Sequence, residues 1–489
     1  MSQVSTSRDG VLRFWKKGQI VELIDVPPDR MLLDLLREDL RACDAKEGCA
    51  AGDCGACTVV VADTSDGVHL NFKALNSCIR PAHAIDGLAL WTAADLPSQG
   101  ALHPVQDAVV KNHGSQCGFC TPGVVMSLFA LYQRTCAKNE PIHKAEVVDA
   151  LSGNLCRCTG YRSIVDAALS LRDFPKVMQD EEGIARQLSG ISSAEHASVN
   201  YQMPLELQAL LKLRAEYPDA QLIAGATDVG IWVKQGQHRL ARIIDLHRVR
   251  ELREVQITAS HLCLGAVVSL QDAFGEISKE RPKVKAFAAR FAGWPVRQSG
   301  TLGGNIANAS PIGDSMPLLL ALDATVVVQA WRNDKLESRE VALSEFYVSY
   351  KKTVMSADEV LVCIKIPRPR KNEWLGLYKV SKRHEDDISA VCMAIRVESS
   401  EQKLKLVRIG LGGVAATPVR AEKTEQVLQN HEDVTAVWVE AQASIKAEFD
   451  PISDLRASGA YRQEVLANLV TRAHRERNCS GAVRLEDLS

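Results

Sequence analysis

Neither a long apolar run nor a surplus of charge of one sign is found in this 489-residue chain. Even MPLLLALDATVVV, one of its most apolar stretches, is cut by Asp323, and a transmembrane helix needs roughly 20 mostly apolar residues. A net charge of −2 offers no general attraction to nucleic acid or to acidic membranes. The N-terminal MSQVSTSRDG has no apolar core of the kind found in signal peptides. These absences predict a cytoplasmic protein that binds neither nucleic acid nor membrane.

The two standard nucleotide-binding motifs are also missing. No G-x-G-x-x-G follows a strand pattern, and there is no Walker A loop. The nearest candidate is GLGGVAA at 410–416, a lone glycine cluster that more often marks a tight strand turn than a dinucleotide site. A nucleotide cofactor therefore needs a different cradle in this chain.

Cysteine is scarce in the last two thirds of the chain and concentrated before it. Ten of the fourteen cysteines precede residue 160, and cytosolic thiols stay reduced, so metal chemistry is expected in the N-terminal third. The isolated cysteines are expected to act as small apolar residues. They are Cys43, Cys136, Cys263, Cys363, Cys392 and Cys479. Cys43 lies near the first cluster of cysteines, so an exchange of ligands there is conceivable.

The first cluster lies in EGCAAGDCGAC and is completed by ALNSCIR further on. Cys49, Cys54, Cys57 and Cys78 have the C-x4-C-x2-C…C spacing of plant-type [2Fe–2S] ferredoxins. Glycine between the cysteines lets the backbone wrap closely and turn its N–H groups toward the sulfurs. Zinc is the weaker interpretation, because structural zinc sites usually join two close C-x2-C pairs.

A second set lies in QCGFC and NLCRCTGY, at Cys117, Cys120, Cys156 and Cys158. Each pair adjoins a predicted helix, so the four thiolates can hold a second [2Fe–2S] cluster between two helix ends. Structural zinc remains an alternative for this set on the spacing alone, although C-x-C suits tetrahedral zinc poorly.

The apolar patterns divide the chain into regions. Residues 11–95 alternate as strands do, with one helical interruption at RMLLDLLREDL. Helical patterns follow at GVVMSLFALYQRT, HKAEVVDALSG and RSIVDAALSLR. The polar, weakly patterned segment 178–198 is predicted to be a linker. From Tyr201 onward short strands and helices mix, and two prolines in IPRPRKNEW mark a further boundary.

Two glycine-rich segments, IAGATDVG and GTLGGNIANASP, run small residue after small residue and so expose successive backbone N–H groups. Such nests bind pyrophosphate without a lysine. Thr227, Thr301, Asn305, Asn308 and Ser310 add side-chain donors. On composition alone, two tight turns packed together remain an alternative.

Together these motifs resemble the molybdenum hydroxylases. KEGCAAGDCGACTVVV, QCGFCTPGVVMS and LSGNLCRCTGYRSIVDA look like their two iron–sulfur domains. LIAGATDVG, SGTLGGNIANASPIGDSMP and KRHEDDIS look like their flavin domain. The resemblance covers nearly the whole chain in the right order and is strongest to the small subunits of bacterial xanthine dehydrogenases.

The resemblance implies an α+β multidomain fold. Its parts are a β-grasp ferredoxin domain (1–95), a helical [2Fe–2S] domain (96–177), the linker (178–198), an α+β FAD-binding domain (199–370) and an α+β C-terminal flavoprotein domain (371–489).

The resemblance also implies which residues bind FAD. Leu222 to Val229 would line the diphosphate and ribityl chain, Asp314 would accept hydrogen bonds from a sugar or the adenine side, and Phe291 would stack over the flavin. The full set is Leu222, Ile223, Ala224, Gly225, Ala226, Thr227, Asp228, Val229, Phe291, Thr301, Gly304, Asn305, Asn308, Asp314, Leu361, Lys379, Arg383 and Asp386. Arg383 and Asp386 would lie beside the ring and influence its potential and its access to nicotinamide. His384 stands where relatives commonly have arginine, and Asn308 where some have threonine, which leaves the nicotinamide preference open.

The function implied is an electron relay in a xanthine dehydrogenase. Electrons would pass from molybdopterin on a large partner subunit to the cluster of Cys117, then to that of Cys49, then to FAD and NAD. The net reaction would oxidise hypoxanthine or xanthine to urate, in an α2β2 heterotetramer, with no acid or base for the purine step on this chain. The alternatives are the equivalent subunit of a hydroxylase for an aldehyde or another N-heterocycle, and a zinc-stabilised scaffold without redox work.

Overall fold

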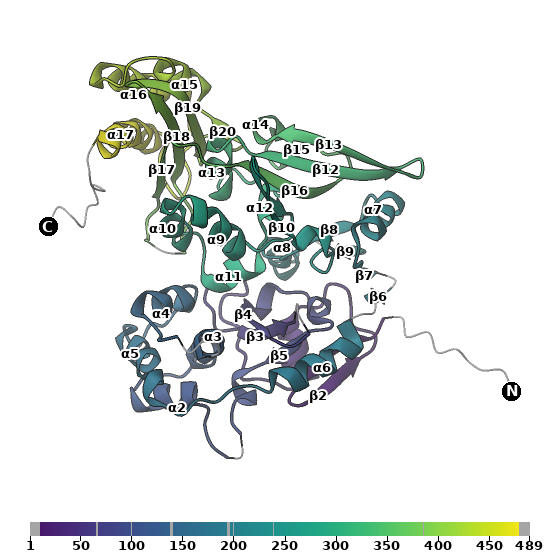
Figure 1. Ribbon diagram of the computed structural model, residues 1–489. Helices are drawn as coiled ribbons and strands as arrows, with labels where there is room; N and C mark the ends of the chain where they lie inside the picture. The colour runs from purple at the N-terminus through teal and green to yellow at the C-terminus, as the bar shows by residue number, and fades with distance from the viewer. Residues whose placement is uncertain are drawn as a thin grey trace. The chain divides into compact units, whose positions relative to one another are not determined.

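The structure is a computed structural model that describes residues 10–64, 67–98, 100–136, 140–192, 196–198, 200–237, 239–384 and 386–478. The chain forms two compact units (Figure 1). The first comprises residues 1–213, 219–250 and 292–300, and the second comprises 214–218, 251–291 and 301–489. The predicted FAD-binding domain, 199–370, therefore contributes segments to both units. Cys479, and the side chain of Cys136, lie outside the described part of the chain.

A five-stranded sheet begins the first unit and confirms the predicted β-grasp domain. Its strands are β1 (Leu12–Lys16), β2 (Gln19–Leu23), β3 (Thr58–Asp63), β4 (Asn71–Asn76) and β5 (Ala89–Trp91), in the order β2-β1-β5-β3-β4. β1 and β5 pair in parallel and the other neighbours pair antiparallel. The predicted helix in RMLLDLLREDL forms a short α1 (Leu32–Asp34) that continues as a π-helical turn over Leu35–Asp39.

Both faces of this sheet are buried, which explains the nearly continuous apolar run of β3. Val59 and Val61 face a core that contains Phe14 and the leucines of α1. Val60 and Ala62 face the opposite core, where the Phe72 ring lies 5.4 Å from Trp91 and 6.0 Å from Phe129. Phe129 belongs to a helix of the next domain, so the ferredoxin sheet and the helical domain share one core.

The helical domain contains the three predicted helices and a fourth. They are α2 (Pro104–Lys111), α3 (Thr121–Cys136), α4 (Lys144–Leu151) and α5 (Arg162–Ser170). α3 begins directly after Cys120, and Pro122 fits its first turn because no backbone N–H is needed there.

The segment 178–198, predicted as a linker, instead contains helix α6 (Glu181–Ser192). Its apolar residues are few but lie on one face, and Ile184, Ala185 and Leu188 pack into the shared core.

Two further segments complete the first unit. A four-stranded sheet has the order β6-β7-β9-β8, formed by β6 (His196–Ser198), β7 (Tyr201–Met203), β8 (Gln221–Ile223) and β9 (Ile243–Asp245), with α8 (Val229–Lys234) after β8. Tyr201 donates a 2.6 Å hydrogen bond to the buried Asp245, and His83 of the ferredoxin domain stacks on its ring at 4.5 Å. α11 (Trp294–Ser299) packs against β4, and Gln298 accepts a 2.8 Å bond from the Ala74 backbone.

In the second unit, a five-stranded antiparallel sheet has the order β10-β11-β16-β12-β13. Its strands are β10 (Val255–Ile257), β11 (His261–Gly265), β12 (Thr325–Arg332), β13 (Lys335–Ala342) and β16 (Val360–Pro367). Alternate residues of β12 are buried, including Val326 and Val328. The helices of this part of the chain are α9 (Leu270–Glu280), α10 (Lys283–Ala289), α12 (Leu302–Ala307), α13 (Ser315–Ala321) and α14 (Leu343–Phe346). Of these, α12 contacts β16 and α14 contacts β13.

A second antiparallel sheet in this unit has the order β17-β18-β19-β20. Its strands are β17 (Glu373–Val380), β18 (Val391–Ser400), β19 (Lys403–Gly412) and β20 (Val419–Arg420), and its helices are α15 (Glu422–Leu428), α16 (Thr435–Glu448) and α17 (Gly459–Asn478). Val407, Ile409 and Leu411 of β19 pack with residues of these helices. Gly410, pointing the other way, lies against the Pro317 carbonyl of α13. Gly413, directly after the end of β19, has a positive φ of 81°, which agrees with the strand turn predicted for 410–416.

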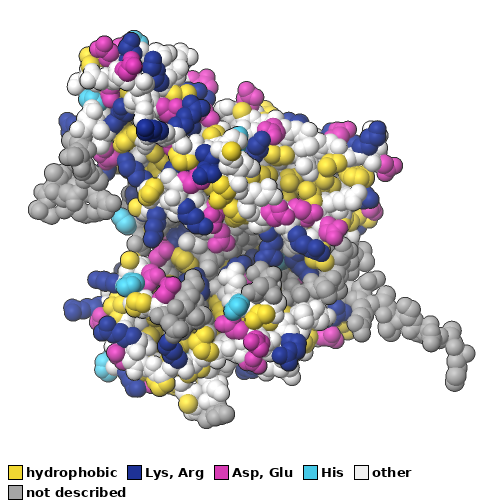
Figure 2. All heavy atoms as spheres, in the orientation of Figure 1, with side chains coloured by type: hydrophobic (Ala, Val, Ile, Leu, Met, Phe, Trp, Pro, Cys, Tyr) yellow, Lys and Arg dark blue, Asp and Glu magenta, His cyan; other side chains and the backbone are white. Residues whose placement is uncertain are grey.

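No helix in the described residues is long and apolar enough to span a bilayer. Figure 2 shows side chains of both charge signs intermixed on the face in view, as the small net charge implies.

The close approach at Gly410 predicts the effect of adding one methyl group. A Cβ at Gly410 would collide with the Pro317 carbonyl oxygen, so Gly410→Ala should destabilise the protein by about 1–3 kcal/mol. Gly275 lies in α9 with open space around it, so Gly275→Ala should stabilise by up to about 1 kcal/mol. Urea unfolding of both variants tests this, and equal effects in the two would contradict the packing described.

Stability on the acid side should depend on His103. Burial lowers the pKa of His103 to about 4, and its Nδ1 accepts a 3.2 Å bond from the Val105 backbone, which keeps the ring neutral. Since the unfolded chain takes up this proton near pH 6.5, stability should fall by about 3 kcal/mol between about pH 6.5 and pH 4. His103→Asn keeps a cap acceptor without this titration. The His103→Asn variant should therefore lose less stability between neutral pH and pH 4 than the wild type does, measured by the midpoints of unfolding at each pH. If both proteins lose the same stability, His103 is excluded as the cause.

Candidate iron–sulfur and flavin sites

The first set of predicted ligands combines three cysteines of the loop before β3 with Cys78, which lies in a turn directly after β4. The Cys49 thiol lies within hydrogen-bonding reach of Cys54 and Cys78, and Cys78 is also within reach of Cys57. The backbone N–H groups of Ala51, Asp53 and Cys54 point at Cys49 Sγ from 3.4, 3.4 and 3.3 Å. Backbone donors around a thiolate are what an anionic iron–sulfur cluster requires. The donor set therefore fits a [2Fe–2S] cluster.

The thiols of this set shift one another's pKa in opposite directions. Hydrogen bonds from Cys54 and Cys78 hold the pKa of Cys49 well below its usual range. The same contacts raise the pKa of Cys54 and of Cys78. Four thiols this close cannot all ionise alone, because like charges repel, so a cation that takes up the charge stabilises the group.

The thiols are linked in a chain of pairs. In the described ranges, no group of three or more His, Cys, Asp or Glu side chains is arranged to hold one metal ion. A diiron cluster does not need three or more side chains around one metal ion, since each iron takes two of the four thiolates.

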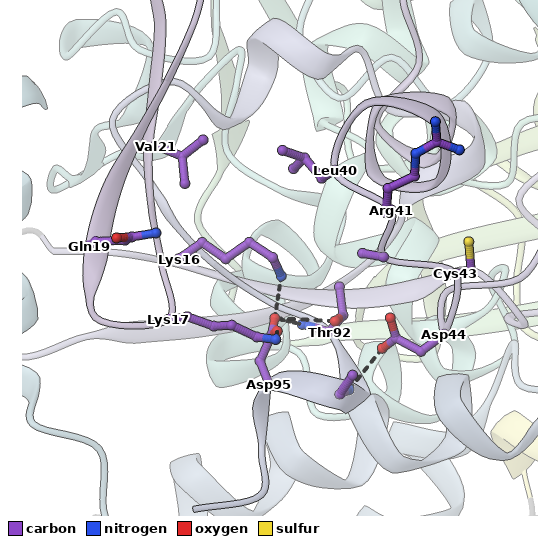
Figure 3. A pocket seen from close by; sticks show the side chains of 12 residues that line it. Lys16, Lys17, Gln19, Val21, Leu40, Arg41, Cys43, Asp44, Thr92 and Asp95 are labelled. Atoms are coloured by element: carbon purple, nitrogen blue, oxygen red, sulfur yellow. Dashed lines mark hydrogen bonds and ion pairs between the residues drawn. The ribbon is translucent and has the colours of Figure 1, made fainter.

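Cys43 is separate from this set. Its Sγ donates to the Arg37 carbonyl oxygen at 3.9 Å. The residue lines a pocket of about 480 Å³ between the β1–β2 hairpin and the end of the π-helical turn, together with Lys16, Lys17 and Asp95 (Figure 3). The contacts of Cys43 are thus with this pocket and with Arg37.

The second set lies at the starts of two helices of the helical domain. Cys117 is within hydrogen-bonding reach of Cys158, and Cys120 of Cys156. Burial and the neighbouring Cys156 raise the pKa of Cys120 to about 12. Burial would also raise the pKa of Cys156, but hydrogen bonds with Thr159 outweigh it and the pKa is lowered. Each of these two thiol pairs takes one cysteine from each helix start. Two such pairs are suited to the two irons of a second cluster.

The two cysteine loops contact each other directly within the first unit. The backbone N–H of Leu155, next to Cys156, donates to the Cys54 carbonyl at 2.9 Å. Asn154 donates to the Gly55 carbonyl at 3.3 Å, and Lys46 donates to the Gly118 carbonyl at 3.0 Å. A short covalent and hydrogen-bonded path therefore joins a predicted ligand of one cluster to a predicted ligand of the other.

The first glycine-rich flavin segment, Leu222 to Val229, runs from the end of β8 through a short loop to the start of α8 in the first unit. A Cβ at Gly225 would collide with the Ser299 carbonyl, so only glycine allows this approach. Ala226 has a positive φ of 56°, the left-handed conformation that occurs in anion-binding nests. The loop has the form expected of a pyrophosphate cradle.

The second segment lies in the second unit, where Thr301 caps α12. Thr301 Oγ1 accepts a 3.1 Å bond from the Gly304 backbone, and Asn305 Oδ1 accepts one of 2.5 Å from Ser315. Asn308 is the C-cap residue directly after α12.

Asp314 is buried, and both of its carboxylate oxygens have partners. Lys379 Nζ donates to Oδ2 at 2.7 Å, and Ser389 Oγ donates to Oδ1 at 2.6 Å. Of these residues, Asp314 and Lys379 are predicted FAD contacts, and the structure brings the two together. A ligand hydroxyl at Asp314 would have to share one of these oxygens.

The remaining predicted flavin residues of the second unit differ in burial. Phe291 packs against Phe274 with ring centroids 5.6 Å apart, and Leu361 lies buried in β16. Arg383 and Asp386 lie in an exposed loop, where the Arg383 guanidinium donates to the Asp386 carbonyl at 3.2 Å. Asp386 has a φ of 48°, a sign of a tightly turned loop.

The patterns in the sequence did not reveal several residues that shape these sites. Tyr161 accepts a 3.0 Å hydrogen bond from the Cys156 backbone, and Ser389 completes the shell of Asp314. Arg290 donates to the Lys379 carbonyl at 2.7 Å. Tyr161 ends the motif NLCRCTGY, Ser389 ends the motif KRHEDDIS, and Arg290 directly precedes Phe291. These positions were the signal available for them.

Comparison with known families agrees with this geometry. Four family models match in succession: a 2Fe-2S iron-sulfur cluster binding domain (17–83), a [2Fe-2S] binding domain (92–169), the FAD binding domain in molybdopterin dehydrogenase (197–369) and the CO dehydrogenase flavoprotein C-terminal domain (376–477). The chain belongs to the molybdenum hydroxylase family. It carries the iron–sulfur and flavin domains of that family.

Several curated proteins that are similar to this chain are named xanthine dehydrogenases. The chain is 31% identical to xanthine dehydrogenase of Drosophila subobscura over 95% of its own length and 39% of the relative. It is 32% identical to xanthine dehydrogenase 1 of Arabidopsis thaliana over 81% of its length and 34% of the relative. The chain thus spans little more than a third of the proteins it matches.

Solved structures share the fold. Reconstituted CO dehydrogenase from Oligotropha carboxidovorans matches with a TM-score of 0.53 and 24% identity, over 57% of this chain and 97% of that one. Quinoline 2-oxidoreductase from Pseudomonas putida 86 matches with a TM-score of 0.51 and 24% identity, over 57% and 96%.

The separate contacts of Cys43 and Cys54 give a matched pair of variants. Cys54→Ala should remove one of two EPR-detectable clusters and reduce iron from about four to about two per chain, because it deletes one of four ligands. Cys43→Ala should keep both signals. An unchanged spectrum for Cys54→Ala, or loss of a cluster in Cys43→Ala, would contradict the ligand assignment.

Proposed function

We propose that the chain is the electron-transfer and NAD-reducing subunit of a xanthine dehydrogenase whose molybdopterin is held by a separate large subunit. Four matched iron–sulfur and flavin domains, together with relatives named xanthine dehydrogenases, support this proposal. We further propose an α2β2 heterotetramer in the cytoplasm that converts hypoxanthine or xanthine to urate.

The proposed cofactors are divided among three groups of residues. Cys49, Cys54, Cys57 and Cys78 hold one [2Fe–2S] cluster, and Cys117, Cys120, Cys156 and Cys158 hold the other. The loop Leu222–Val229 binds the FAD diphosphate, with Thr301, Gly304, Asn305, Asn308 and Asp314 as further contacts. When bound, the clusters supply one-electron chemistry and the flavin supplies two-electron chemistry with a nicotinamide.

The observation that carries the proposal is the hydrogen bond from the Leu155 backbone to the Cys54 carbonyl. It ties the two ligand loops together inside one core, as a relay needs and as two independent structural zinc sites do not. Redox work is therefore favoured over a zinc-stabilised scaffold.

The surface around the second cysteine set supports its place at the partner's side. Cys117 and Cys158 are exposed, whereas Cys57 and Cys78 of the first set are buried. Phe119, Leu155 and Tyr161 next to them are 47%, 43% and 38% exposed. Apolar side chains gathered at an exposed redox site suit the face that receives a protein partner. No residue of this chain is assigned as acid or base for the purine, since that site belongs to the partner.

The proposed acceptor is NAD, reached through the loop of Arg383 and Asp386. This loop is exposed and carries both signs of charge, which suits a ligand that must arrive, react and leave. Lys379 and Leu361 are proposed to lie nearer the flavin because both are buried.

The purified two-subunit complex tests this function with a split assay. Xanthine-dependent NAD reduction should fall to background in Cys158→Ala, because the electron path loses a ligand. NADH-dependent reduction of a dye should persist, because it needs only FAD and the nicotinamide site. Cys263→Ala is the matched control and should keep both activities, because the thiol neighbour of Cys263 is Cys363 of β16 and not a predicted ligand.

Other outcomes would correct particular parts of the proposal. Conversion of an aldehyde to its carboxylic acid, or hydroxylation of another N-heterocycle, without purine turnover would change the substrate. Absence of NADH–dye activity in the wild-type complex would refute NAD as the acceptor. A colourless, zinc-containing protein would refute the relay.

A further inference from the structure

Helix α8 (Val229–Lys234) connects two parts of the first unit that the sequence keeps more than a hundred residues apart. Its N-terminal side continues directly from the glycine-rich loop Leu222–Val229. Its other contacts are with the ferredoxin domain, and they fall beside both ends of the first cysteine set.

The first contact is between Gly230 and Ile79. A Cβ at Gly230 would collide with the Ile79 carbonyl oxygen and backbone, so the helix lies directly on the chain there. Ile79 follows the predicted ligand Cys78. Gly230 also donates a 2.7 Å hydrogen bond to the Ala226 carbonyl of the glycine-rich loop. One residue therefore touches both the loop and the ligand segment.

The second contact is an ion pair at the other end of the helix. Lys234 Nζ lies 2.8 Å from Glu47 and 3.2 Å from Asp34. Glu47 stands two residues before the predicted ligand Cys49, and Asp34 ends α1. The Lys234 side chain is only 16% exposed, so water screens this pair less than a surface pair.

Between these two contacts, Ile231 packs against the apolar core of the ferredoxin domain, which includes Leu33, Leu36 and Ile79. Three residues of a six-residue helix thus bind one domain through three kinds of contact. A short helix held this way cannot slide or rotate without breaking several contacts at once.

We propose that α8 fixes the distance between the first cluster and the flavin, and that Gly230 and Lys234 are its positioning residues. This inference rests on the proposed binding of FAD at Leu222–Val229. One electron leaves the reduced cluster and one electron arrives at the flavin, and no bond is made or broken between the two centres. The rate of such a transfer falls steeply with separation, so a displaced α8 slows it.

Lys234→Met is the deciding variant, because it keeps the apolar stem and removes only the charge that Glu47 and Asp34 bind. Rapid photoreduction of the iron–sulfur clusters in the complex, followed by flavin bleaching, measures the internal transfer. Bleaching should be several-fold slower in Lys234→Met and restored in Lys234→Arg. NADH–dye activity should not change in either, since it does not use the clusters. Lys111→Met, at an exposed i,i+4 pair with Asp107, is the matched control.

Gly230→Ala gives an independent readout. The added methyl must push α8 away from Ile79, so backbone amides of residues 226–234 should exchange with deuterium several-fold faster than in the wild type. Gly190→Ala in α6, where nothing lies within 4 Å, should exchange as the wild type does. If Gly230→Ala fails to fold, Lys234→Met alone decides.

Unchanged bleaching in Lys234→Met, with wild-type bleaching observed, would overturn the role of α8. Absence of bleaching in the wild type would instead refute the proposed cluster-to-flavin function, so the two failures are distinguishable. A loss of NADH–dye activity equal to the loss of bleaching would show a general defect and would also overturn the positioning role.

Discussion

The hydrogen bond from the Leu155 backbone to the Cys54 carbonyl forms only because the two cysteine loops approach each other closely. Each loop must surround a compact anion with backbone donors, which costs conformational freedom and excludes bulky side chains. At Gly55 the φ is 71°, and any Cβ would collide with the carbonyl of Gly153, itself in a positive φ of 86°. The proposed electron path therefore requires residues without a side chain where the two loops approach each other, as at Gly55.

This closeness is possible because the two iron–sulfur domains are not separate bodies. Strand β3 is buried on both faces, and Phe129 of α3 fills the side opposite α1. Neither domain can bury its apolar surface without the other. The ligand loops lie at the margin of this common core, which gives them a rigid base and leaves Cys117 and Cys158 at the surface.

Much of this arrangement could be predicted from the sequence. The C-x4-C-x2-C spacing identifies the first set, because one short loop must supply three ligands, and the helices next to Cys120 and Cys158 are recognisable from their apolar periodicity. Other features depend on distant contacts. The segment 178–198 appeared to be a linker because α6 has only a narrow apolar face. Its helix is stabilised by a core that includes Trp15 and Phe72, which lie more than a hundred positions earlier. The mutual partners of Asp314, Lys379 and Ser389 are brought together by the sheet, and no local pattern places them side by side.

The position of α6 has a consequence for dissecting the chain. Ile184, Ala185 and Leu188 lie within the iron–sulfur core, and Glu181 accepts a 2.6 Å bond from the Leu70 backbone. A fragment that ended before Glu181 would expose to water the apolar core residues that α6 covers. The backbone N–H of Leu70 would also lose its hydrogen-bond acceptor. A fragment that carries the two iron–sulfur domains should therefore extend through Ser192, well beyond the last cysteine motif.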